Sequence, residues 1–451
     1  MTLIHSEKIE SYSGRLCCLA MGLCLLLPSI AIADDISSVQ EQIAQLASYM
    51  DWLWTCMAAF IVFFMQAGFA LLESGLIRAK NAVEVMMKNV AIFSVGVIAF
   101  WAIGFGIMFS GDLYEFFLNP DMSSYGEDPN RMYSFLLFQT VCAATVATIA
   151  SGSMAERTRF GAYLAFSILV AAVIYPVAGS WIKGGLWHGG GWLEEMGFVD
   201  FAGSTVVHSV AGWIALAGAI MVGPRLGRFN RVGSIIPMGR HNLGMATLGV
   251  FILWLGWFGF NAGSTTSIDG GSFSRVAVTT NLAAASGALM ALFAHWMKFR
   301  YPDVGVMLNG ALAGLVSVAA GCYIMTPLGA LLVGAIGGVV MFFSVDFFKR
   351  LHIDDPVDAI SVHGVCGTWG ALACTVPFFC RPNEAAELMT QLVGVGSIFA
   401  YVFTVSLVMF YAIKKTIGLR LTESEEIEGG GDGGDGFGTI EPAVIKGETP
   451  A

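Results

Sequence analysis

Eleven apolar runs, each close to twenty residues long, constrain the fold of this chain more than any other feature of its sequence. A helix needs about 20 apolar residues to cross the roughly 30 Å hydrocarbon core of a bilayer. The runs therefore predict an all-α polytopic membrane protein with eleven transmembrane helices. Their approximate limits are 51–75, 89–110, 133–153, 160–182, 203–222, 244–263, 276–297, 304–322, 327–347, 359–378 and 391–413.

The composition supports this prediction. Only 12% of the 451 residues are charged and 56% are hydrophobic, whereas soluble domains carry about 25% charged residues. Fifty-five glycines suit membrane helices that pack closely through small residues. A soluble globular domain, a disordered chain and a nucleic-acid-binding protein are all excluded.

The two ends of the chain differ from the apolar body. Lys8 and Arg15 are followed by an apolar run and by Ala31-Ile32-Ala33, so we interpret 1–33 as a signal peptide. The alternative is an uncleaved first span, and both interpretations place residue 34 outside the cytoplasm. Residues 34–50 read as a short external segment, 51–418 as the eleven-helix domain, and 419–451 as a flexible, acidic and Gly-rich tail.

Basic residues fall mainly in one set of alternate loops, which orients the chain, because cytoplasmic loops are enriched in Lys and Arg. The predicted cytoplasmic set is Arg78, Lys80, Lys88, Arg157, Arg159, Arg225, Arg228, Arg231, Arg240, Lys298, Arg300, Lys349, Arg350, Lys414, Lys415 and Arg420. The opposite loops carry Arg131, Lys183, Arg275 and Arg381. The mature N-terminus is therefore expected outside and the C-terminus in the cytoplasm.

A sequence pattern recurs at the start of the fifth and tenth runs, which cross the membrane in opposite directions. Asp200-Phe-Ala-Gly-Ser-Thr-Val-Val-His208 aligns with Asp355-Pro-Val-Asp-Ala-Ile-Ser-Val-His363. We expect a five-plus-five inverted repeat with one further helix, and one histidine from each half near the midplane, where such repeats place their working sites.

Histidine is costly in hydrocarbon unless it faces protein or a water path. His208 and His363 could therefore line a narrow path for a small polar molecule or a proton; the alternative is two structural histidines bonded to carbonyl groups. No third ligand recurs nearby, so we expect neither a metal site nor a cofactor. Asp200 and Asp355 are candidate helix caps, and Asp200 could also favour cations at the outer mouth.

These segments resemble the ammonium transporter family (Amt/Mep/Rh), and most closely its Amt branch. The resemblance rests on the two histidine motifs and on Trp257-Phe-Gly-Phe-Asn-Ala-Gly-Ser264. Ala155-Glu156-Arg157 and Gly75-Leu-Ile-Arg-Ala-Lys-Asn81 add to it, and it covers about residues 50–428.

The resemblance implies a homotrimer in the cell membrane with one pore through each subunit. It implies that ammonium binds at an outer vestibule, loses a proton, and crosses as ammonia past His208 and His363. By motif position, Trp187, Ser264 and Asp200 resemble the vestibule residues. Phe260 and Phe138 resemble gate residues.

Two departures from the family pattern stand out. Cys142 occupies the position of the outer gate phenylalanine, so the cation–π face of that ring is missing there. A Gly/Asp-rich stretch replaces the helical continuation of the tail, which puts regulation by a PII-type protein at the cytoplasmic face in question.

Three functions remain open at this point. The leading interpretation is an ammonium transporter, with or without net movement of the proton. The second is an ammonium sensor that conducts little. The third is a membrane enzyme that uses the two histidines, but the sequence shows no nucleophile, metal cluster or cofactor motif to support it. We therefore expect ammonium, the lipid bilayer and further copies of the chain as partners, and no enzymatic activity.

Overall fold

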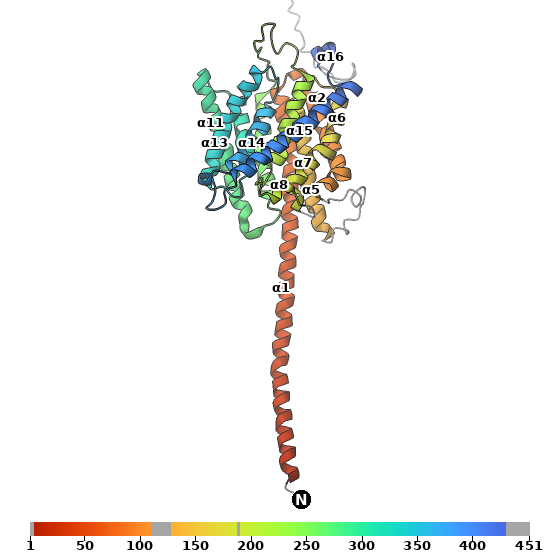
Figure 1. Cartoon of the computed structure of the whole chain (residues 1–451), viewed down its shortest axis with the longest axis vertical. Helices are drawn as coiled ribbons and strands as arrows, with labels where there is room; N and C mark the ends of the chain where they lie inside the picture. Colours follow the sequence, from red (N-terminus) through yellow and green to blue (C-terminus); the bar gives the residue numbers. More distant parts are fainter. Residues whose placement is uncertain (1–3, 110–127, 187–189, 430–451) are drawn as a thin grey trace, which may run out of the picture. The chain divides into compact units, whose positions relative to one another are not determined.

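Helices make up almost all of the computed structural model, which describes residues 4–109, 128–186 and 190–429 (Figure 1). Within these ranges the only β-structure is a few isolated bridges. The chain divides into two compact units, Met1–Leu53 and Trp54–Ala451. The first unit is part of helix α1 (Ile4–Leu76), and residues 34–50 are helical within it.

The second unit continues with short and long helices in the order of the chain. In its first half these are η1 (Ala79–Asn81), α2 (Ala82–Ala99), η2 (Phe100–Gly104), α3 (Phe105–Phe109), α5 (Pro129–Gly152), α6 (Phe160–Leu169), η4 (Val170–Ile174), α7 (Tyr175–Lys183), η5 (Gly184–Leu186), α8 (Trp192–Glu195), η6 (Ser204–Ser209) and α9 (Val210–Val222). In its second half they are α10 (Leu243–Trp257), η7 (Phe258–Ala262), η8 (Asp269–Gly271), α11 (Ser272–Phe299), α12 (Val304–Ala319), α13 (Pro327–Arg350), η9 (Ile360–Val365), α14 (Cys366–Ala373), η10 (Pro377–Phe379), α15 (Leu388–Thr416) and α16 (Glu423–Glu428).

The described residues contain nine helical segments that are long and apolar enough to cross a membrane. The two other predicted spans correspond to shorter helices, α12 and the pair η9–α14. An all-helical membrane protein is thus confirmed, and the count of eleven spans stays a prediction. Large apolar side chains such as Phe251, Phe293 and Val408 are exposed on the bundle, as lipid-facing residues would be.

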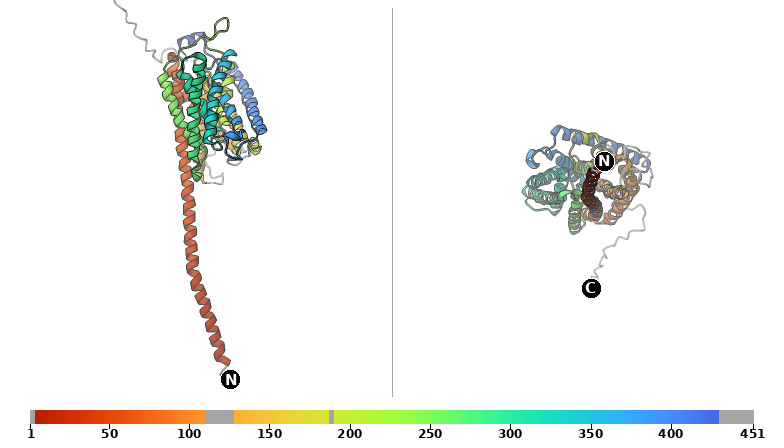
Figure 2. Two further views of the ribbon diagram at one scale, coloured as in Figure 1. Left: turned by 90° about the vertical axis from the view of Figure 1, so that its left-hand side faces the viewer. Right: turned by 90° about the horizontal axis from the view of Figure 1, so that it is seen from below.

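The two halves of the bundle lie side by side when it is seen along its axis (Figure 2, right). Helix α9 of the first half contacts η9 of the second, and α14 of the second half contacts η6 of the first. These reciprocal contacts are what an inverted repeat predicts. Helix α15 runs obliquely across the bundle and packs against α6, α9 and α14, so it joins both halves (Figure 1).

Small residues allow helices α11, α12 and α13 to pack closely. A Cβ atom added to Gly287 would lie 2.4 Å from the carbonyl oxygen of Gly310, and one added to Gly338 would lie 2.2 Å from that of Gly287. Any larger residue at these positions would force the helices apart. Membrane helices use such contacts because van der Waals packing drives their association.

Lys88 is a correction to the predicted loops. It lies inside α2 with 1% of its side chain exposed, and its Nζ donates to Glu73 Oε2 at 2.7 Å. The Nζ of Lys88 also lies 5.2 Å from the ring centroid of Tyr163. The prediction was wrong because the sequence does not show whether a basic residue at the edge of an apolar run lies in a loop or inside the helix. The partner that neutralises Lys88, Glu73, lies on the preceding helix α1.

Candidate functional site

His208 and His363 meet in the interior of the bundle. Their Nδ1 atoms lie 3.2 Å apart, and 0% and 4% of the two residues is exposed. A hydrogen bond between two Nδ1 atoms requires one ring to donate and the other to accept. Two neutral rings in this contact therefore hold their protons on different nitrogens, so the pair has a donor end and an acceptor end.

Each histidine lies in a π-helical turn, His208 in η6 and His363 in η9. Such turns widen a helix locally and are frequent at functional sites. A Cβ atom added to Gly212 would lie 2.1 Å from the backbone nitrogen of Gly364, so glycine is required for the backbones to approach here. This close approach brings the two rings together.

Aromatic rings enclose the pair. The Trp257 ring stacks on His208 with centroids 5.1 Å apart, and the Phe260 ring lies 5.3 Å from it. Both residues are fully buried. Within the described residues, His208 Nε2 and Trp257 Nε1 are buried without a hydrogen-bond partner. The interior thus combines an apolar lining with polar atoms able to bond a small molecule.

The two repeat aspartates stand at the starts of the histidine segments. Asp200 Oδ2 accepts hydrogen bonds from the backbone N–H groups of Thr205 and Val206 at 3.1 and 2.7 Å. Asp355 accepts from those of Val357 and Ile360 at 3.3 and 2.8 Å. Both carboxylates therefore cap a helix start, as the repeat predicts.

A small pocket, which we call the Ser264 pocket, lies at the same end of the bundle as Asp200. Its volume of about 30 Å³ admits one or two molecules the size of water. The lining includes the predicted residues Phe138, Cys142 and Ser264. The Ser264 hydroxyl donates to the carbonyl of Phe260 at 2.8 Å, which leaves its oxygen free to accept from a ligand.

The structure places Lys183 in the wall of this pocket, a residue that sequence reasoning assigned only to a loop. The predicted vestibule residue Trp187 lies outside the described residues. Phe260 is not part of the pocket wall and instead packs on His208.

A second pocket of about 200 Å³, the Asp200 pocket, adjoins the first because Lys183 and Phe201 line both. Asp200 and Glu194 also line it. Burial raises the pKa of the Asp200 carboxyl above its usual value, although the charge of Lys183 and the backbone hydrogen bonds act to lower it.

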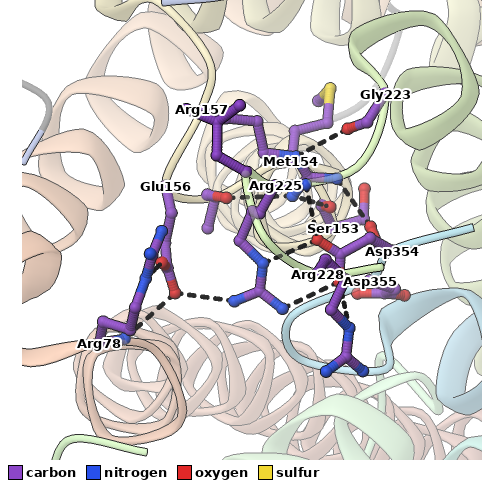
Figure 3. A network of polar contacts seen from close by, with 12 residues as sticks. Arg78, Ser153, Met154, Glu156, Arg157, Gly223, Arg225, Arg228, Asp354 and Asp355 are labelled. Carbon is purple, nitrogen blue, oxygen red and sulfur yellow. Dashed lines mark hydrogen bonds and ion pairs between the residues drawn. The ribbon is translucent and has the colours of Figure 1, made fainter. Parts of the chain in front are cut away.

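The opposite end of the bundle contains a buried network of charges (Figure 3). Arg225 donates from Nε to Asp354 Oδ2 at 2.7 Å and from Nη2 to Asp354 Oδ1 at 2.9 Å. Its Nη1 donates to Glu156 Oε1 at 2.9 Å. Glu156 also pairs with Arg78. Arg157 donates to the carbonyl oxygen of Asp354 at 2.7 Å.

A large cavity of about 770 Å³ opens beside this network and is lined by residues of both signs, among them Arg225, Arg240, Asp346 and Asp355. Burial and the neighbouring charge of Asp358 raise the pKa of Asp355 to about 7. In the part of the chain that the structure describes, no three His, Cys, Asp or Glu side chains cluster closely enough to hold a metal ion. Cys322 and Cys380 are free thiols.

A family model, that of the Ammonium Transporter Family, matches residues 53–432, which is most of the chain and includes the histidine pair, both pockets and the charge network. The chain belongs to the ammonium transporter family. Among curated relatives, it is 40% identical to ammonium transporter Amt2 of Archaeoglobus fulgidus, over 92% of this chain and 93% of that protein. It is 38% identical to ammonium transporter Amt1 of Haloferax mediterranei, over 85% of this chain and 78% of that protein.

Solved structures give the same family and fold. A protein titled Sensor Amt Protein matches with a TM-score of 0.81 and 38% identity, over 86% of this chain and 98% of that one. Mep2 of Candida albicans matches with a TM-score of 0.74 and 27% identity, over 84% of this chain and 87% of that one. The predicted family and the predicted helical membrane fold are thereby confirmed, and the relatives include both named transporters and a named sensor.

Proposed function

We propose that this member of the ammonium transporter family binds ammonium at the Ser264 pocket, removes a proton from it, and conducts ammonia past His208 and His363. The observation that carries the proposal is the buried histidine pair, with Nδ1 atoms 3.2 Å apart and His208 Nε2 lacking a partner among the described residues. A buried nitrogen of this kind offers a hydrogen bond to a small neutral molecule that passes it.

Physical chemistry favours the neutral molecule as the species that crosses. An intact cation would be expensive to move past the apolar rings of Trp257 and Phe260. Ammonium differs from a metal cation of similar size because it has N–H donors and a removable proton. The proton can return to the outer side, or it can cross separately along the two histidines.

The second candidate is an ammonium sensor that binds the ion and conducts little. Two observations favour it: the 38% identity to a structure titled Sensor Amt Protein, and the presence of Cys142 and Lys183 in the wall of the Ser264 pocket. Cys142 supplies no aromatic face for a cation, and Lys183 brings a positive charge of its own.

The test is the transient current after an ammonium pulse in proteoliposomes of the purified full-length protein. We expect a current in the wild type and its loss in His208→Ala. The matched control is His241→Ala, because His241 is exposed and lies away from the histidine pair, with its ring Nδ1 against the carbonyl oxygen of Ser74. Equal currents in all three proteins would refute the role of the histidine pair. Ammonium binding without a current or ammonia flux in the wild type would favour the sensor.

We also propose that the chain forms a homotrimer in the cell membrane, with its N-terminus outside and its C-terminus in the cytoplasm. The support is the family membership together with the basic loops. Mass measurement of the detergent-solubilised protein by light scattering tests the assembly, and a monomeric mass would contradict it.

A further inference from the structure

Lys183 brings an ammonium group of its own to the proposed binding site. It is the last residue of α7, and its side chain lines both the Ser264 pocket and the Asp200 pocket. Its Nζ donates to the carbonyl oxygen of Phe201 at 2.7 Å and lies 6.0 Å from the centroid of the Phe201 ring. A carbonyl acceptor and an aromatic ring are the contacts that a free ammonium ion would seek.

The Ser264 pocket is too small for two cations. Its volume of about 30 Å³ fits one or two water-sized molecules, so an entering ammonium ion would lie close to the Lys183 side chain in its wall. Like charges at such short distances repel strongly in a partly buried site. Either the lysine moves, or the ion binds weakly.

The neighbouring pocket offers the lysine a second position. Asp200 is 4% exposed, and its Oδ1 has no hydrogen-bond partner among the described residues, because only Oδ2 bonds the backbone. Lys183, Asp200 and Glu194 all line this pocket of about 200 Å³. A lysine side chain has rotatable bonds along its whole stem, so its head can exchange the Phe201 carbonyl for these carboxylates.

Other fixed cations cover the aromatic surface next to the site. The Phe201 ring stacks on Tyr323 with centroids 5.0 Å apart. The guanidinium groups of Arg275 and Arg381 lie 5.2 and 5.5 Å from the Tyr323 ring. Lys183, Arg275 and Arg381 are three of the four basic residues that the sequence places in the outer loops. The aromatic pair beside the pocket is therefore already occupied by positive charge.

We propose that Lys183 is a resident cation of the Ser264 pocket, which an ammonium ion must displace toward Asp200 and Glu194 before it can bind. The lysine thereby lowers the affinity of the site and sets the ammonium concentration at which the protein responds. This inference rests on the proposed function, since it concerns the same pocket and the same ion.

The test measures ammonium binding to purified full-length protein by isothermal titration calorimetry with ammonium chloride, using potassium chloride as the ion control. Lys183→Met and Lys183→Gln remove the charge, and the glutamine keeps a donor for the Phe201 carbonyl. We expect both to lower the Kd for ammonium at least about tenfold. Lys183→Arg keeps the charge and is expected to change the Kd much less.

Arg131→Met is the matched control, because it removes a positive charge from the same predicted face without touching the wall of either pocket. Its Kd is expected to stay at the wild-type value. Thermal unfolding of each variant in detergent shows whether it is folded.

Each outcome decides the matter. Tighter binding in both neutral variants, or binding in them where the wild type has none, supports the proposal. A wild-type Kd in the folded neutral variants, or weaker binding in them, overturns it and leaves ammonium binding, hence the proposed function, in place. If no folded protein of the set binds ammonium, the proposed function fails, and this inference fails with it.

Discussion

Asp354→Asn should destabilise the protein strongly, because Asp354 holds the buried charge network together. Its side chain is 0% exposed and accepts hydrogen bonds from Arg225 Nε at 2.7 Å and from Arg225 Nη2 at 2.9 Å. Burial acts to raise the pKa of this carboxyl, but the hydrogen bonds from Arg225 and the charge of Arg157 hold the pKa well below its usual range. The native state therefore contains the carboxylate with its positive partners.

The magnitude follows from what the substitution leaves behind. Arg225 would keep Glu156 at 2.9 Å, but Arg228, whose Nε pairs with Asp354 at 3.3 Å, would lose its partner carboxylate. Removing one partner of a buried ion pair costs about 3–5 kcal/mol. Asp346→Asn is the control, because its pairs with Lys298 and Arg350 are partly exposed. Exposed pairs contribute about 0–1 kcal/mol.

The assay is unfolding of the purified protein in mixed detergent micelles by increasing dodecyl sulfate, followed by tryptophan fluorescence at pH 7. Because the pKa of Asp354 is lowered by folding, its contribution to stability is complete above the unfolded value of about 3.9 and declines as the pH falls below that value. A loss for Asp354→Asn no larger than that for Asp346→Asn would refute the reasoning.

Three further predictions concern the pocket and the two ends of the chain. Cys142→Phe should lower the ammonium Kd about 2- to 30-fold, since a cation–π contact contributes about 0.5–2 kcal/mol; Cys142→Leu, which adds bulk without a ring, should not, and equal calorimetric Kd values would contradict this. Glu426→Gln should speed proteolysis of the tail, because Glu426 anchors α16 to Arg420 and to the backbone N–H of Leu226, both at 2.7 Å; unchanged cleavage rates would contradict it. The mass of the purified protein, measured by mass spectrometry, should correspond to a chain that begins at Asp34; a mass that includes residues 1–33 would show that the signal is not cleaved.

The sequence predicted those parts of the site that lie on long, ordered motifs. His208 and His363 recur at matching positions of the two repeats, so their meeting in the interior could be inferred, and Asp200 precedes the first of these segments by a fixed spacing. The π-helical turns that orient the histidines could not be, because the hydrophobic pattern of a short turn does not differ from that of an α-helix.

Residues at loop ends escaped the prediction for a different reason. Lys183 was assigned to a loop by its charge, while its place in a pocket depends on contacts with Phe201 and with residues far apart in the chain. Glu73 and Lys88 likewise neutralise each other across two helices. A charged residue in an apolar sequence indicates that it has a partner, but only the fold identifies which residue that partner is.

The two ends of the bundle differ in how firmly their charged residues are held. At one end Arg225 links Glu156 of the first half to Asp354 of the second through short, buried ion pairs, so a substitution there leaves a buried charge unpaired. At the other end Lys183 is held by one carbonyl and borders two pockets, and Asp200 Oδ1 is still unpaired among the described residues. We therefore expect substitutions at this second end, where Cys142 and Lys183 lie, to change ammonium affinity more than stability.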